Sequence, residues 1–326
     1  MPSKLKHPFE FEPDYGFSLP ELDALQPNDA PEDFQSFWQQ KYRQALAVAP
    51  YLSLQDTQQV RGSWRIFDCY YNSTKQVRCG GWLLLPKSGH INAAIISAHG
   101  YGGIRELNSR LSLKHTAILM PCVRGIGRSA KAPISDNPMW HVLHNIQDKQ
   151  RYIIGGCVQD LWCAATALIR LFPQVTNNLG FMGSSFGGGL GIFACAFDKR
   201  IQRAHFHVPT FGNVPLRLKL PTLGSGAALQ QFYNAEPQLA LSTLRYFDSA
   251  TAARYLSIPS HWALALFDPC VAPPGQFSAY NQAPQPKQRF LLRAGHFDYP
   301  TKQQQRQQLE QELELFFEPL SEPYES

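Results

Sequence analysis

The sequence predicts an α/β fold in which helices cover a doubly wound, mostly parallel sheet. Short, continuously apolar runs recur beyond residue 90, and such runs are typical of strands buried on both faces. Helical patterns lie between these runs, and this alternation indicates a parallel sheet. The 326 residues are 44% hydrophobic and 17% charged, which is enough apolar surface for a large core and excludes wholesale disorder.

Residues 1–90 are expected to form an N-terminal extension and the first antiparallel strands of the same domain. Aromatic side chains at helical spacing predict a helix from Asp33 to Val48. From Val60 to Pro86 the pattern changes to short β segments separated by turn residues, and Gly80–Leu85 is a predicted strand.

Residues 91–326 are expected to form the core of the domain. The predicted strands are Ala93–Ala98, Thr116–Met120, Leu179–Met182, His261–Phe267 and Arg289–Arg293, with a strand-like segment at Ala204–Val208. The predicted helices are Asp160–Phe172, Phe186–Ala196 and Lys302–Phe317.

One interval, residues 210–258, is too long for a simple crossover between strands. It contains Pro215, Pro221, Pro237 and a Gly224-Ser-Gly226 break. We expect a helical insertion within the core, over the sheet edge, where a lid or substrate wall would lie.

Composition limits the partners and the cellular location. The net charge is +5, from 30 Lys and Arg against 25 Asp and Glu, but the basic residues are scattered, so no nucleic-acid partner is expected. No uninterrupted apolar run reaches the ~18 residues that span a bilayer, so no membrane partner is expected. The N-terminus lacks the apolar segment of a signal peptide, and the expected location is the cytoplasm.

The seven cysteines predict neither a metal site nor a disulfide framework. Their number is odd, no CxxC occurs, and most lie in apolar contexts typical of small buried side chains. Gly125-Ile-Gly127 lacks the third glycine and the helix of a dinucleotide fingerprint. We therefore expect no metal and no other cofactor.

Residues 183–187, Gly-Ser-Ser-Phe-Gly, fit the G-x-S-x-G pattern of a nucleophile elbow. A predicted strand precedes them and an apolar helix follows. Glycines two residues before and after Ser185 permit the close turn, and the helix N-terminus offers free N–H groups to an oxyanion. Ser185 is the candidate nucleophile, because a motif centred on Ser184 would put Met182 and Phe186 at the glycine positions. A glycine-rich turn without chemistry is the alternative interpretation.

A serine nucleophile needs a base and a carboxylate that orients it, in the chain order Ser, Asp or Glu, His in α/β-hydrolases. His296 follows the last predicted strand, in a loop where such folds carry their chemistry. Asp268 follows the strand 261–267 and is the candidate acid. Asp248 is better explained as a helix N-cap, and Asp298 is a rival two residues from His296.

The remaining histidines are weaker candidates. His205 and His207 come too early in this order, and His261 begins an apolar strand, which favours a structural role. His99 is expected to shape its loop, and Arg124 to tie a loop near the active site.

An oxyanion hole is predicted from two backbone N–H groups. Phe186 follows the nucleophile, and Tyr101 lies in the glycine-rich segment 99–103 after an early strand. The Tyr101 ring could also form a wall of the substrate pocket, and Phe211 is a second candidate for such a wall.

Taken together, these motifs resemble the acetyl xylan esterase and cephalosporin C deacetylase family of the α/β-hydrolase superfamily. The similarity covers roughly residues 30–318. It rests on Phe37-Trp38, Gly81–Pro86, His99–Gly103, Arg124-Gly125, Phe172–Val175, Gly183–Gly189, Leu244–Asp248, Phe267-Asp268, Pro273-Pro274, Ala279–Asn281 and Gly295-His296.

The resemblance implies deacetylation of small esters by a Ser185–His296–Asp268 triad with no metal or nucleotide, and a homo-oligomer, of which a hexamer is typical in the family. Three positions depart from the family pattern, where Ile126 and Phe186 replace glutamines and Phe297 replaces a glutamate. A more apolar edge of the site would favour less polar substrates.

We therefore expect a serine carboxylesterase that acts on small acyl esters, in particular acetyl esters of sugars or related small molecules. Two alternatives remain open: an amide or peptide hydrolase that uses the same triad, and a non-catalytic binding protein with a hydrolase fold.

Overall fold

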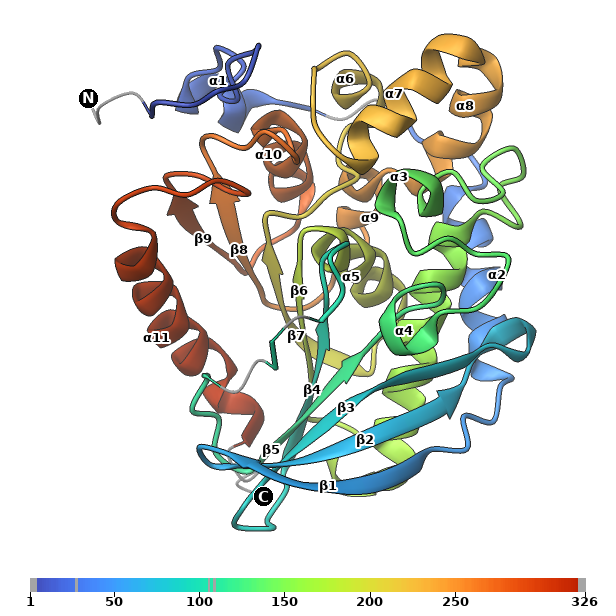
Figure 1. Cartoon of the computed structure of the whole chain (residues 1–326), viewed down its shortest axis with the longest axis vertical. Coiled ribbons are helices and arrows are strands. Elements are labelled where there is room, and N and C mark those ends of the chain that lie inside the picture. The colour runs from blue at the N-terminus through green and yellow to red at the C-terminus, as the bar shows by residue number, and fades with distance from the viewer. Residues whose placement is uncertain (1–4, 27–28, 105, 108–109, 322–326) are drawn as a thin grey trace.

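A nine-stranded sheet lies at the centre of the computed structural model, which describes residues 5–26, 29–104, 106–107 and 110–321 (Figure 1). The strand order is β1-β2-β3-β5-β4-β6-β7-β8-β9. β1 to β3 pair antiparallel, as do β3 and β5, whereas all other neighbours are parallel. The predicted mostly parallel sheet is therefore confirmed.

The strands have the following bounds: β1 (Ser53–Arg61), β2 (Trp64–Asn72), β3 (Arg78–Pro86), β4 (Ala93–Ala98), β5 (Thr116–Pro121), β6 (Leu179–Ser184), β7 (Ile201–His207), β8 (Ser260–Ala265) and β9 (Lys287–Leu292). The α-helices are α1 (Leu19–Ala24), α2 (Phe34–Leu46), α3 (Pro138–His141), α4 (Ile153–Leu171), α5 (Phe186–Phe197), α6 (Val214–Arg217), α7 (Ser225–Ala235), α8 (Pro237–Leu244), α9 (Ser249–Ala253), α10 (Pro273–Gln282) and α11 (Lys302–Ser321).

Helices cover both faces of the sheet (Figure 1). One core joins side chains of α2, α4 and α5 with one face, and a second core joins Leu309, Leu313 and Phe317 of α11 with the other. All residues of β4, β5 and β8 are buried, as expected of strands covered on both sides. This burial explains why their continuous apolar runs predicted them correctly.

Helix α4 starts earlier than the sequence pattern predicts, at Ile153 rather than at Asp160. Gly155 and Gly156 in its first turn are poor helix formers and concealed its beginning. By length and composition α4 could cross a membrane, but 78% of its apolar window is buried within the protein. It packs against α2, α5 and the sheet as a core helix.

Residues 210–258 contain the helices α6 to α9. In Figure 1 α6, α7 and α8 gather at the end of the molecule toward which the arrows of β8 and β9 point. α9 packs on α5 and α10, so the segment is joined to the helices beside the carboxyl ends of the strands.

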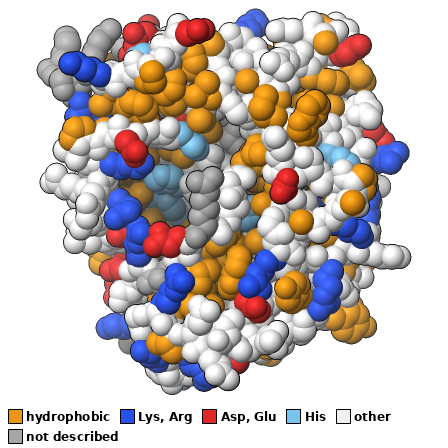
Figure 2. All heavy atoms as spheres, viewed as in Figure 1, with side chains coloured by type: hydrophobic (Ala, Val, Ile, Leu, Met, Phe, Trp, Pro, Cys, Tyr) orange, Lys and Arg blue, Asp and Glu red, His pale blue; other side chains and the backbone are white. Residues whose placement is uncertain are grey.

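The surface charges are dispersed. On the face shown in Figure 2, Lys and Arg side chains alternate with Asp and Glu side chains rather than forming one basic patch. This distribution agrees with the scattered charges of the sequence.

A buried ion pair ties three elements together. The Arg124 Nη2 lies 2.6 Å from the Asp160 Oδ1 in α4, and these side chains are only 5% and 0% exposed. Arg124 also donates to the hydroxyls of Ser73 and Thr74 in the turn between β2 and β3. Its backbone N–H donates to the second oxygen of Asp160. This geometry agrees with the structural role predicted for Arg124.

We predict that Asp160→Asn lowers the free energy of unfolding by about 3–5 kcal/mol, because it leaves the Arg124 charge buried without its partner. Urea denaturation followed by tryptophan fluorescence measures this difference. A loss below about 1 kcal/mol would contradict the interpretation that the pair holds these elements together.

Candidate active site

Ser185 lies at the turn between β6 and α5 in a backbone conformation that side chains rarely adopt. Its φ is 54° and its ψ is −111°. A Cβ added to Gly183 would lie 2.4 Å from the Gly187 carbonyl oxygen, and one added to Gly187 would lie 2.5 Å from that of Ala98. Glycine at both positions is therefore a steric requirement of the turn, as the motif predicts.

The structure brings the three predicted triad side chains together. His296 Nε2 lies 2.9 Å from the Ser185 Oγ, and His296 Nδ1 lies 2.8 Å from the Asp268 Oδ2. A carboxylate only accepts hydrogen bonds, so Nδ1 carries the proton and Nε2 is free to accept from the serine hydroxyl. The three groups form one continuous hydrogen-bonded chain.

Asp268 is completely buried but has hydrogen-bond donors at both oxygens. The backbone N–H groups of Cys270 and Val271 donate to Oδ1, each at 2.9 Å. The Gln276 side chain in α10 donates to Oδ2 at 3.3 Å and also to the Val271 carbonyl. These donors compensate the cost of burying a carboxylate beside the histidine.

The environment of His296 raises its pKa above the ordinary value for histidine. Burial by itself lowers this pKa, but the hydrogen bond and the negative charge of Asp268 outweigh burial. The Asp268 carboxylate therefore stabilises the protonated imidazole, as a general base in acyl transfer requires.

The two predicted oxyanion donors lie beside the nucleophile. Phe186 is the first residue of α5, so its N–H has no acceptor within the helix. A Cβ added to Gly100 would lie 3.7 Å from the Ser185 Cβ, which places the loop that carries Tyr101 directly against the serine. The rings of Tyr101 and Phe186 stack with centroids 3.9 Å apart, and this contact holds the two donor segments together.

His141 and Gln276 are two supporting residues that sequence reasoning missed. The buried His141 Nε2 lies 3.0 Å from the Arg124 carbonyl oxygen, and its Nδ1 lies 3.2 Å from the Tyr101 hydroxyl. Because a carbonyl only accepts, Nε2 carries the proton and Nδ1 accepts from the tyrosine. Burial lowers the pKa of His141 to about 4, which keeps this tautomer neutral. Neither residue lies in a motif, so only the folded contacts identify them.

The rival residues from the sequence lie in other contacts. Asp248 caps α9 through the N–H of Ala250, as predicted, and the exposed Asp298 pairs with Lys302. His205 and His261 are buried and lie 3.1 Å apart, measured between their Nδ1 atoms. The His99 Nδ1 lies 2.7 Å from the Gly100 carbonyl, in agreement with a loop-shaping role.

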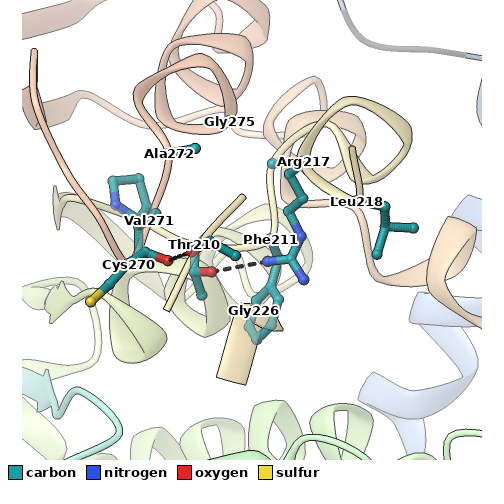
Figure 3. Close-up of a pocket in the computed structure, with 12 residues that line it drawn as sticks. Thr210, Phe211, Arg217, Leu218, Gly226, Cys270, Val271, Ala272 and Gly275 are labelled. Carbon is teal, nitrogen blue, oxygen red and sulfur yellow. Dashed lines mark hydrogen bonds between the residues drawn. The ribbon is translucent and has the colours of Figure 1, made fainter. Parts of the chain in front are cut away.

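A small pocket lies between the triad loop and the helical segment 210–258 (Figure 3). It encloses about 20 Å³, and Thr210, Phe211, Arg217 and Cys270 are among its lining residues. The Phe211 ring lies edge-on to the Phe186 ring at 6.0 Å, and the Thr210 N–H donates to the Ser185 carbonyl at 3.2 Å, so this pocket lies close to the turn that carries the serine. The Arg217 Nη1 donates to the Thr210 hydroxyl at 3.2 Å, whereas its buried Nε has no partner among the described residues.

A larger cleft of about 650 Å³ is lined by His296 itself, and Ser184, His207, Tyr299 and Arg306 are among its other lining residues. The three positions that depart from the family pattern do not line either cavity in the described part of the chain. Phe186 and Ile126 are buried, and Phe297 packs on Phe9 and Phe267. Their apolar side chains are therefore used in packing.

Comparisons with known proteins show which family and which solved folds this chain resembles. The acetyl xylan esterase family model matches residues 15–314. Acetyl xylan esterase 1 from Thermoanaerobacterium sp. JW/SL YS485 superposes with a TM-score of 0.78 at 19% identity, covering 94% of this chain and 99% of that one. The acetyl xylan esterase from Paenibacillus sp. R4 gives 0.79 at 20% identity, covering 91% and 99%. A Pyrococcus horikoshii acylaminoacyl peptidase gives 0.62 at 15% identity, covering 82% and 43%.

We predict that Gly187→Ala destabilises the protein by about 1–3 kcal/mol, because its Cβ overlaps the Ala98 carbonyl. Alanine is otherwise the better helix former by about 1 kcal/mol, so propensity alone predicts stabilisation. Gly100→Ala is the matched control, since its Cβ would meet its nearest atoms at 3.7 Å. Thermal or urea unfolding measures both variants, and equal stabilities would disprove the steric explanation.

Proposed function

The chain belongs to the acetyl xylan esterase family, and we propose that it hydrolyses small acetyl esters through an acyl-enzyme on Ser185. Family membership establishes a carboxylic ester hydrolase of the serine α/β-hydrolase type that acts on small-molecule esters. The observation that carries the finer proposal is the hydrogen-bonded chain from Ser185 through His296 to Asp268.

In the proposed first step the Ser185 Oγ attacks the carbonyl carbon of the ester. His296 Nε2, at 2.9 Å, accepts the hydroxyl proton, while Nδ1–H remains bonded to Asp268. The charge that develops on the carbonyl oxygen accepts hydrogen bonds from the Tyr101 and Phe186 N–H groups. Collapse of the tetrahedral intermediate breaks the ester C–O bond, and His296 returns the proton to the departing alcohol.

Water completes the reaction by the reverse proton path. His296 takes a proton from the water molecule as it attacks the acyl carbon, and the same two N–H groups stabilise the second oxyanion. The Ser185 Oγ recovers the proton when acetate leaves. Each proton thus passes through the Nε2 atom of His296. The hydrogen bond from Nδ1–H to Asp268 keeps the imidazole in the tautomer that this transfer requires.

The dimensions of the pocket beside Phe211 favour a short acyl group. About 20 Å³ is room for little more than one water-sized group, which suits the methyl of an acetyl ester. The alcohol portion would then occupy the wider cleft beside His296. The Tyr101 ring, proposed from the sequence as a wall of the substrate pocket, stacks on Phe186 and is not among the residues that line either cavity.

We predict that Ser185→Ala reduces kcat for p-nitrophenyl acetate at least about a thousandfold, because it removes the nucleophile but leaves the elbow intact. Hydrolysis of p-nitrophenyl esters from acetyl to octanoyl provides the measurement, and activity should be highest for acetyl. A wild-type chain that hydrolyses an acetyl anilide faster than the acetyl ester would instead support an amide hydrolase. Absence of all hydrolysis by the wild type would favour a binding protein.

The pH dependence of kcat/KM should follow the ionisation of His296. The imidazole acts as a base only when neutral, so activity is lost as the pH falls through the pKa of His296. Since Asp268 raises this pKa, the midpoint of the acid limb is expected above 6.5. Steady-state kinetics on a neutral acetyl ester between pH 5 and 9 measures it, and a midpoint well below 6 would contradict this role of Asp268.

A further inference from the structure

A second cavity, whose lining includes none of the three triad residues, has five cationic side chains among the residues that line it. It encloses about 200 Å³ between α2, the turn after β2 and the beginning of α4. Figure 1 shows these elements together, and α4 contacts both α2 and that turn. Its cationic lining residues are Lys41, Lys75, Arg124, Lys131 and Arg151.

Lys41 is the most unusual member of this group because it is almost completely buried, with 3% exposure. Its Nζ donates to the Gln150 carbonyl at 3.2 Å and lies 4.9 Å from the centre of the Phe37 ring. No carboxylate oxygen within the described ranges lies within 4.0 Å of this nitrogen. Lys41 therefore lines the cavity without a salt bridge to any described carboxylate.

Two adjacent glycines make room for the buried cations. A Cβ on Gly155 would lie 3.0 Å from the Lys41 Cε, and one on Gly156 would lie 2.5 Å from the Arg124 Nη1. Each glycine costs about 1 kcal/mol in a helix interior, so the start of α4 loses helix stability in order to admit two positive side chains.

The negative charges nearby do not balance the positive ones. Asp160 is already bound by Arg124, which leaves Asp148 as the acidic neighbour that raises the pKa of Lys41. Burial has the larger effect. Burial, together with the positive charges of Lys75 and Arg124, lowers the pKa of Lys41 to about 8 despite the opposing charge of Asp148. Ile153 and Gly156 at the N-terminal end of α4 also line the cavity and add the positive end of a helix dipole.

We propose that this cavity binds a phosphate group, either free or as part of a small phosphomonoester. A dianion would supply the counter-charge that Lys41 lacks, and ammonium groups arranged as separate point charges suit a tetrahedral oxyanion. The exposed side chains of Lys75, Lys131 and Arg151 also line the cavity and would bind the remaining phosphate oxygens.

Isothermal titration of the full chain with inorganic phosphate, at constant ionic strength in chloride, tests this site. Binding to the wild type is expected, and Lys41→Met should weaken it about tenfold or more through loss of a charge-assisted hydrogen bond. Lys87→Met is the matched control, because it makes the same substitution at an exposed lysine outside the cavity. Equal affinities of the wild type and Lys41→Met, or no binding to the wild type, would overturn the proposal.

A second variant covers the case in which Lys41→Met fails to fold. Lys131 is exposed at the same cavity, so Lys131→Ala should remain folded and still weaken phosphate binding severalfold. Unchanged affinity in Lys131→Ala would contradict the site. Parallel titration with glycerol 1-phosphate distinguishes a phosphomonoester ligand from free phosphate. If glycerol 1-phosphate binds more tightly than orthophosphate, the site takes a phosphomonoester, and if it binds more weakly, the site takes the free ion.

Discussion

The active site depends on the close packing of the turn at Ser185 against the end of β4. The carbonyl oxygen of Ala98 lies so near Gly187 that no side chain fits between them. This contact sets the start of α5, where Phe186 lies, directly beside the loop that carries Tyr101. The positive φ of Ser185 is the local cost of that arrangement, and β6, which leads into Ser185, is held between its parallel neighbours β4 and β7.

The electrostatics of the site follow from the topology of the parallel sheet. Asp268 and His296 both follow neighbouring strands, β8 and β9, at their carboxyl ends, so their loops meet next to the turn after β6. Two amides and Gln276 hold the Asp268 carboxylate, and the carboxylate in turn fixes the histidine tautomer. The Asp268 and His296 side chains can therefore form a hydrogen bond, because the ends of β8 and β9 already bring their two loops together.

Much of this arrangement could be predicted from the sequence, because it lies in local patterns. Apolar runs identified β4, β5 and β8, and the elbow motif together with the chain order identified Ser185, Asp268 and His296. Contacts between distant segments could not be predicted in this way. Gln276 reaches Asp268 only because α10 folds back over β8, and Lys41 meets α4 only because α2 packs on it. Glycines at the start of α4 also weakened the helical pattern that would have located it.

The most direct test of the account is to locate the serine that reacts. The wild-type chain would be treated with a fluorophosphonate, digested and analysed by mass spectrometry. The account predicts a single phosphonylated residue, Ser185, and loss of labelling in His296→Ala, since His296 Nε2 accepts the serine proton. Labelling of Ser184, or no labelling of a folded chain, would contradict the central claim.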